Sequence, residues 1–283
     1  AIWVLVLVWH VTLTIARLMA IQLAFCYHIP KMRTVVKRIL PAKGASLLAH
    51  YGLTLLIPLL IVILVRLQSV QMLAFAVVVL AKWRMFAVRP RFWLANLRAN
   101  AVDIIVGLSA VVFIIQADSA LGQVVWAALY AGWLLVVKPR SSTLGTSVQA
   151  GIAQVAGLGA LYQAGAGWAS LELVVCASLI CYLSARHFFD GFEEQHSRLL
   201  SYIWAYFAAA LSWLLAHWLL FYGVISQPTV LLTLISFSLA WLYYMAQQSD
   251  LTVRLRRQVL CVMGVIVLLI LLLSDWGDKV VGS

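Results

Sequence analysis

The sequence predicts an all-α fold, a polytopic integral membrane bundle of about ten transmembrane helices. Three observations predict it: the composition, the apolar runs and the placement of the cations. Of the 283 residues, 65% are hydrophobic and only 10% are charged. A soluble domain is about 45–50% apolar and roughly 25% charged. Lipid can cover the apolar surface that a soluble core of this size would have to leave in water.

Ten apolar runs are candidates for the helices, since a helical span needs about 20 residues. They lie at about 2–26, 47–65, 69–81, 101–117, 120–137, 147–163, 168–185, 199–223, 224–247 and 259–276. The third run is short. The sixth is polar for a span because it carries Gln149, Gln154 and Gln163. Hydropathy alone leaves these two undecided.

The placement of the cations decides both cases. Positive charge gathers after the first and third runs, at Lys31, Arg33, Lys37, Arg38 and Lys43, and at Lys82, Arg84, Arg89, Arg91 and Arg98. Lys and Arg accumulate in cytoplasmic loops, so an even number of crossings separates the two groups. The run at 47–65 is one crossing, and the run at 69–81 must be the other.

The same parity decides the sixth run: Lys138 and Arg140 precede it, and Arg186 and Arg198 follow the seventh run, so two crossings separate these cytoplasmic groups. Of the 20 Lys and Arg, Arg66 and Lys279 fall outside and Arg17 within a span, which leaves 17 on the cytoplasmic side. This predicts both termini on the non-cytoplasmic side, in a prokaryotic cytoplasmic (inner) membrane. The one-sided placement of the cations indicates that the net charge of +11 anchors the protein to the cytoplasmic side of the bilayer. The same placement argues against nucleic acid as the partner.

Two basic loops, at about 28–46 and 82–100, mix cations with apolar side chains. We expect them to lie in the headgroup region, with anionic lipid headgroups as partners. The cations expected to contact headgroup phosphate are Lys37, Arg38, Arg84, Arg89, Arg91 and Arg98. The alternative is a surface that docks a partner subunit or a phosphate-bearing substrate.

Ionisable groups within spans are functional candidates because they are costly in lipid. Arg17 lies in the first run and Glu172 in the seventh, and both are candidate substrate ligands. Asp103 stands at the edge of the fourth run, where a helix N-terminus favours its charge. A lone membrane carboxylate can carry a proton or bind a cation. The structural alternative is that Glu172 pairs with Arg17 or reaches the headgroups.

The eighth run is rich in aromatic side chains. Spacing of three and four puts Tyr206, Trp213, His217 and Phe221 on one face. Such a face can hold an organic cation through the ring quadrupoles, which makes Tyr206, Trp213 and His217 candidate substrate ligands. Ordinary packing and interface belts are the alternative. In the sixth run, glycines and glutamines suit either a broken helix or close helix packing.

The acidic loop at 186–198 has two pairs at i, i+3 spacing, His187 with Asp190 and Glu193 with His196. This spacing places two metal ligands on one side of a helix, as in di-iron carboxylate proteins. Those proteins need further ligands, and Gly191 interrupts the pattern. A solvated connection between spans is the alternative.

The chain is predicted to be a single transmembrane domain, 1–283, without a nucleotide-binding fingerprint. The leading hypothesis is a transporter or channel for a small molecule or ion, proton-coupled through Glu172. The first alternative is a membrane-embedded enzyme that acts on a lipid or lipid-linked headgroup through the 187–196 loop. The second is a non-catalytic subunit, in a homo-oligomer or docked to a partner. No residue pattern identifies a cofactor.

Overall fold

The fold was analysed in a computed structural model. It describes residues 45–87, 89–140, 142–216, 221–222, 225–247 and 251–273. This part of the chain is all-helical apart from one antiparallel pair of two-residue strands, β1 (Phe221–Tyr222) and β2 (Ile225–Ser226). The all-α prediction is therefore confirmed. The first predicted run, 2–26, lies outside the described residues, as does most of the basic loop at 28–46.

A helix overlaps each of the predicted runs that the described residues cover. The helices are α2 (Ala45–Arg66), α3 (Gln71–Leu80), α4 (Trp93–Ala99), α5 (Ala101–Ile115), α6 (Ala120–Gly132), α7 (Thr143–Ala164), α8 (Ser170–Gly191), α9 (Ser197–Leu215), α10 (Gln227–Gln247) and α11 (Val253–Leu273). Short helical turns are η1 (Gln68–Val70), η2 (Trp83–Met85) and η3 (Pro90–Phe92), and the π-helical turn η4 (Trp133–Val137) extends α6.

Five helical segments are long and apolar enough to cross a membrane: Ala120–Val137, α8, α9, α10 and α11. A sixth is added if Pro90–Ala99 and Ala101–Ile115, which meet at a bend of 63°, form one span. The apolar parts of α2 and α3 are shorter. Leucines cover the exposed faces of α2 and α11, including Leu53, Leu59, Leu268 and Leu272. This surface fits an integral membrane protein, in which lipid covers it.

Some helix ends differ from the predicted runs. The eighth run was expected to continue to residue 223, whereas α9 ends at Leu215 and β1 follows. The next helix begins at Gln227 with Pro228 in its first turn, where the missing proline N–H costs nothing. Serine caps start two other helices: Ser119 Oγ accepts from Gly122 N, and Ser142 Oγ accepts from Gly145 N, each at 3.0 Å.

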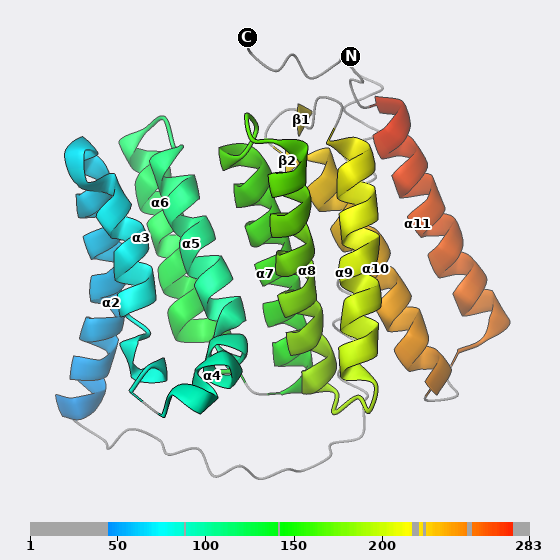
Figure 1. Ribbon diagram of the computed structural model, residues 1–283, viewed down its shortest axis with the longest axis horizontal. Coiled ribbons are helices and arrows are strands. Elements are labelled where there is room, and N and C mark those ends of the chain that lie inside the picture. The colour runs from blue at the N-terminus through cyan, green and yellow to red at the C-terminus, as the bar shows by residue number, and fades with distance from the viewer. Residues whose placement is uncertain are drawn as a thin grey trace. The chain divides into compact units, whose positions relative to one another are not determined.

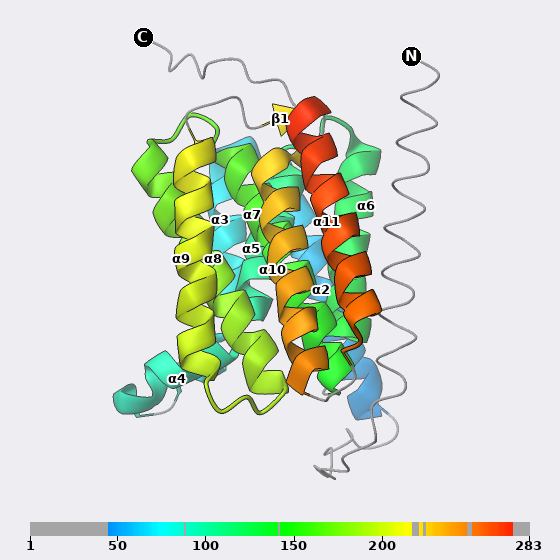
Figure 2. The same ribbon diagram turned by 90° about the vertical axis from the view of Figure 1, so that its right-hand side faces the viewer.

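Helix α7 lies at the centre of the packing, in contact with α5, α8 and α10 (Figure 1). Figure 2 shows α10 between α9 and α11, both of which it contacts. α7 is one continuous helix, so the broken-helix alternative does not hold. Its glycines serve close packing instead: a Cβ placed at Gly157 would lie 2.7 Å from Ile105 Cγ2 and 2.8 Å from Ile180 Cγ2.

Two buried clusters form the interior. The aliphatic core is built mainly by α2, α3, α5 and α6, and includes Ile61, Val65, Val78, Val102, Val106, Val111, Ile114, Tyr130 and Trp133. The aromatic core is built by α7, α8, α9 and α10, and includes Tyr162, Phe188, Phe189 and Trp204, with the partly buried Phe237 and Tyr244 packed against them. In the aromatic core, Phe188 packs against the rings of Trp204, Phe237 and Tyr244, with centroids 5.6–6.1 Å apart.

Candidate functional site

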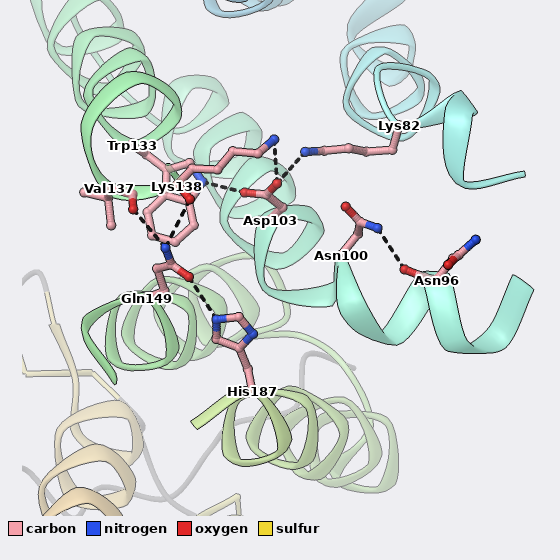
Figure 3. Close-up of polar contacts among 9 residues, drawn as sticks. All are labelled: Lys82, Asn96, Asn100, Asp103, Trp133, Val137, Lys138, Gln149 and His187. Carbon is pink, nitrogen blue, oxygen red and sulfur yellow. Dashed lines mark hydrogen bonds and ion pairs between the residues drawn. The ribbon is translucent and has the colours of Figure 1, made fainter. Parts of the chain in front are cut away.

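A charged group of side chains, the Asp103 cluster (Lys82, Asp103, Trp133 and Lys138), joins the ends of three elements beside the aliphatic core (Figure 3). Asp103 lies in the first turn of α5. Its Oδ2 accepts from Lys82 Nζ and from Lys138 Nζ, each at 2.6 Å. Its Oδ1 accepts from Trp133 Nε1 at 3.0 Å. Both carboxylate oxygens are therefore bonded.

The local backbone explains why these residues meet. The N-terminus of α5 favours the negative charge of Asp103. Trp133 is the first residue of the π turn, and Lys138 follows its last residue. A hydrogen bond of 2.9 Å from Lys138 N to Trp133 O closes the turn. In a regular α-helix, residues five apart point about 140° away from each other. The wider π turn directs both side chains to one carboxylate, and such turns are frequent at functional sites.

The Asp103 cluster carries one more positive than negative charge. The side chains of Lys82 and Asp103 are each 11% exposed, whereas Lys138 is 40% exposed. Burial lowers the pKa of Lys82 to about 8, although the negative charge of Asp103 acts in the opposite direction. The burial of a cation beside a second cation has a free-energy cost that one carboxylate offsets only in part.

Gln149 links this end of the aliphatic core to α8. Its Nε2 donates to the carbonyl oxygens of Val137 at 2.8 Å, Lys138 at 3.2 Å and Arg140 at 2.8 Å. Its Oε1 lies 2.9 Å from His187 Nε2, so His187 donates from Nε2 in this arrangement (Figure 3). The Gln149 amide thus donates hydrogen bonds to carbonyl oxygens that have no helical N–H partner where the π turn ends.

A second set of polar side chains is buried on the helices that build the aromatic core. Gln154 is fully buried on α7, and its Oε1 accepts from Trp204 Nε1 of α9 at 3.2 Å. Within the part of the chain that the structure describes, Gln154 Nε2, Ser184 Oγ of α8 and Ser236 Oγ of α10 have no hydrogen-bond partner. The next residue after Ser236 is Phe237, whose ring centroid lies 5.1 Å from that of Trp204. We call Gln154, Ser184 and Ser236 the neutral polar set.

Glu172 lies in the first turn of α8, where its Oε2 accepts from Ala169 N at 3.3 Å. The residue is exposed. It lines an open surface hollow together with Trp168, Leu171, Val175 and Cys176. This position gives the carboxylate a helix-capping contact.

The predicted aromatic face of the eighth run points outward where it is described. Tyr206 is 78% exposed and Trp213 is 51% exposed. The buried face of α9 consists instead of Ser201, Trp204, Ala208, Ser212 and Leu215. His217 and Arg17, the other two candidate substrate ligands, lie outside the described residues.

The candidate metal ligands of the 186–198 loop engage separate partners. His187 bonds to Gln149, and Asp190 Oδ1 lies 3.1 Å from Arg186 Nη2. Glu193 has a positive φ of 56°, and His196 Nδ1 lies 3.9 Å from Glu194 Oε1. Among the described residues, no three His, Cys, Asp or Glu side chains gather as a metal site would require.

The second basic loop contains η2, η3 and α4. Arg89, Arg91 and Arg98 are exposed there, and the Arg91 guanidinium lies 4.6 Å from the centre of the Phe92 ring. Lys37 and Arg38 lie outside the described residues, as does the side chain of Arg84. The predicted contacts of these cations with headgroups remain predictions.

No pattern in the sequence predicted a site that contains Lys82, Lys138, Trp133 and Gln149. Charge parity predicts that Lys82, Lys138 and Asp103 lie on the same side of the membrane, and this prediction could have indicated that they meet. The π turn has no such signature in the sequence. Comparison of the chain with protein-family models, curated proteins and solved structures finds no match.

Proposed function

We propose that the chain is a multi-spanning membrane transporter or channel for a small molecule, with ten spans and both termini on the non-cytoplasmic side of a prokaryotic inner membrane. The observation that carries the proposal is the neutral polar set, which is buried on the helices that build the aromatic core. Its three atoms lie on α7, α8 and α10 and have no partner among the described residues. These helices pack directly, since α7 contacts both of the others.

A buried polar atom without a partner costs about 1–3 kcal/mol. An apolar side chain in place of Gln154, Ser184 or Ser236 would avoid that cost. The presence of polar side chains at these positions is therefore best explained by their binding a polar ligand. Transporters commonly bind substrate near the middle of the bilayer between packed helices. An amide and two hydroxyls supply donors and acceptors without net charge. We therefore propose that the substrate is a small neutral or zwitterionic polar solute.

The test uses the full chain in proteoliposomes, with glycerol, urea and glycine as osmotic probes in stopped-flow light scattering. We expect entry of at least one probe to exceed that into protein-free liposomes. Gln154→Leu should then slow this entry at least tenfold, which corresponds to about 1.4 kcal/mol.

The matched control is Gln163→Leu, which makes the same change on α7 at a position outside the neutral polar set. It should keep the rate of the unchanged chain. Equal slowing by both variants would argue against a site at Gln154. Permeability equal to that of protein-free liposomes for all three probes would contradict the proposal for solutes of this class.

Proton coupling through Glu172 is a separate part of the proposal. The support for it is the presence of a carboxylate in a predicted span beside an open hollow. Glu172→Gln keeps an oxygen that can cap α8. If the coupling is real, the variant should lose the acceleration of solute entry by an imposed pH gradient and keep entry without a gradient. An unchanged response to the gradient would remove Glu172 from the mechanism.

A further inference from the structure

We propose that Lys82 and Lys138 together bind the phosphate of an anionic membrane lipid, with Asp103 as the residue that positions both ammonium groups. This goes beyond the proposed transport function and does not depend on it. The inference rests on the charge balance of the Asp103 cluster, the distance between the two cations and the side chains of the adjoining η2–α4 segment.

The charge balance favours an anion. Two ammonium groups contact one carboxylate oxygen, so a single positive charge is left over where Lys82 is 11% exposed. Among the described residues, neither lysine pairs with a second acidic side chain. Because a lysine ammonium has three donors, each has hydrogen atoms left for another acceptor. A phosphate would neutralise the excess and accept from both.

The geometry allows one phosphate to meet both cations. Each Nζ lies 2.6 Å from the same Oδ2, so the two nitrogens are no more than about 5 Å apart, within reach of the oxygens of one phosphate group. Lys138 is 40% exposed, so an anion can approach from its side. Asp103 and Trp133 fix the arrangement by the bond of 3.0 Å between Oδ1 and Nε1.

The neighbouring segment indicates a lipid as the source of the phosphate. Trp83, next to Lys82, is 63% exposed, and Phe86 and Trp93 are each 42% exposed. The rings of Phe86 and Trp93 pack edge to face, with centroids 5.6 Å apart. Aromatic rings of this kind lie at the headgroup level of a bilayer. Exposed Arg89, Arg91 and Arg98 on the same segment would add attraction to an anionic surface.

The test measures the melting temperature of the purified full chain in detergent during titration with short-chain phosphatidylglycerol. Phosphatidylcholine and inorganic phosphate serve as separate comparisons. Phosphatidylglycerol should raise the melting temperature by about 5 °C at saturation. Phosphatidylcholine and inorganic phosphate should raise it by less than half as much.

Three variants locate the site. Lys138→Gln keeps the Lys82–Asp103 pair and should weaken the apparent affinity for phosphatidylglycerol at least tenfold. Lys138→Arg should retain most of it. Arg256→Gln removes an exposed cation from the first turn of α11 and should bind as the unchanged chain does.

Equal affinity of Lys138→Gln and the unchanged chain would overturn the proposal, as would the absence of any shift with phosphatidylglycerol. An equal shift with inorganic phosphate would show that free anion, not lipid, is the ligand. Transport is not measured in this experiment, so its outcome is independent of the proposed function.

Discussion

Helices α3, α5 and α6 surround a carboxylate whose oxygens are all bonded, whereas α7, α8 and α10 enclose neutral polar atoms that have no partner among the described residues. The first region has an aliphatic core and keeps its charges at helix ends. The second has an aromatic core and keeps amide and hydroxyl groups inside it. Arg186 also carries a buried charge, but it lies near the end of α8 and is paired with Asp190.

This difference follows from the cost of burial. An ion in an apolar medium needs a counter-charge and access to water, so it is retained near the end of a helix. A neutral amide or hydroxyl costs far less and can stay within the bundle. The two regions therefore suit different ligands. The charged end suits the anionic lipid proposed for it, and the aromatic core suits the neutral solute of the proposed transport function.

The largest effect is expected from the charged region. Asp103→Asn would leave Lys82 and Lys138 beside each other without a counter-charge, and should lower the free energy of unfolding by about 3 kcal/mol. The measurement is thermal unfolding in detergent. Asp118→Asn makes the same change at an exposed position and should alter stability by less than about 0.5 kcal/mol. Similar losses in both variants would mean that the cluster has no special role.

The next effect concerns α7, which separates the two regions. Gly157→Ala places a methyl carbon within 2.8 Å of the Cγ2 atoms of Ile105 and Ile180. The substitution should destabilise the protein by about 2 kcal/mol. Gly264→Ala is the control, because nothing lies within 4 Å of its Cβ position. It should stabilise α11 by up to about 1 kcal/mol. Stabilisation by both would show that α7 can shift to admit the methyl group.

A pair of buried serines tests the comparison within the aromatic core. Ser212 Oγ and Tyr162 Oη are hydrogen-bonded at 2.8 Å, so Ser212→Ala leaves the tyrosine hydroxyl unpaired and should cost about 1 kcal/mol. Ser184 Oγ has no partner among the described residues, so Ser184→Ala should be neutral or slightly stabilising. A loss for Ser184→Ala equal to that for Ser212→Ala would show that its hydroxyl is satisfied.

The smallest effect is the pH dependence contributed by Lys82. Its pKa is lowered to about 8 in the folded chain, from 10.5, so the unfolded chain binds more protons between these values. Stability should therefore rise with pH across this window. The groups facing Lys82 are Asp103 and Lys138.

Between pH 7.5 and 8.5, the unchanged chain should gain about 0.7 kcal/mol relative to Lys82→Met. The melting temperatures of both proteins at each pH measure the difference. Phosphatidylglycerol should reduce the gain, since a bound phosphate keeps the ammonium charged. Parallel pH profiles of the two proteins would contradict the lowered pKa.

Much of the helical architecture could be predicted because it depends on local composition. The apolar runs located α2, α3 and the helices from α5 to α11. That the short run at 69–81 crosses the membrane, as charge parity predicts, stays a prediction. Asp103 was expected at a helix N-terminus, where it lies. These features need only hydropathy and the sign of charge.

The contacts of the site could not be predicted because they depend on helix rotation. Each residue turns a helix by about 100°, so an error of one residue moves a side chain to another face. Spacing places Tyr206 and Trp213 together but does not tell whether lipid or protein covers them. The same limit applies to Gln149: the sequence shows a polar residue in an apolar run, and the structure shows three carbonyls that it bonds.

The π turn at Trp133–Val137 makes the charged end depend on the backbone geometry of a single turn. In a regular α-helix of the same length, Lys138 would point about 140° away from Trp133 and could not share Asp103 with it. A one-residue deletion in this turn would leave the two residues four positions apart, about 40° from each other on one face of a regular α-helix. A chain one residue shorter at this point would therefore keep the lipid site without the π turn, at nearly identical hydropathy.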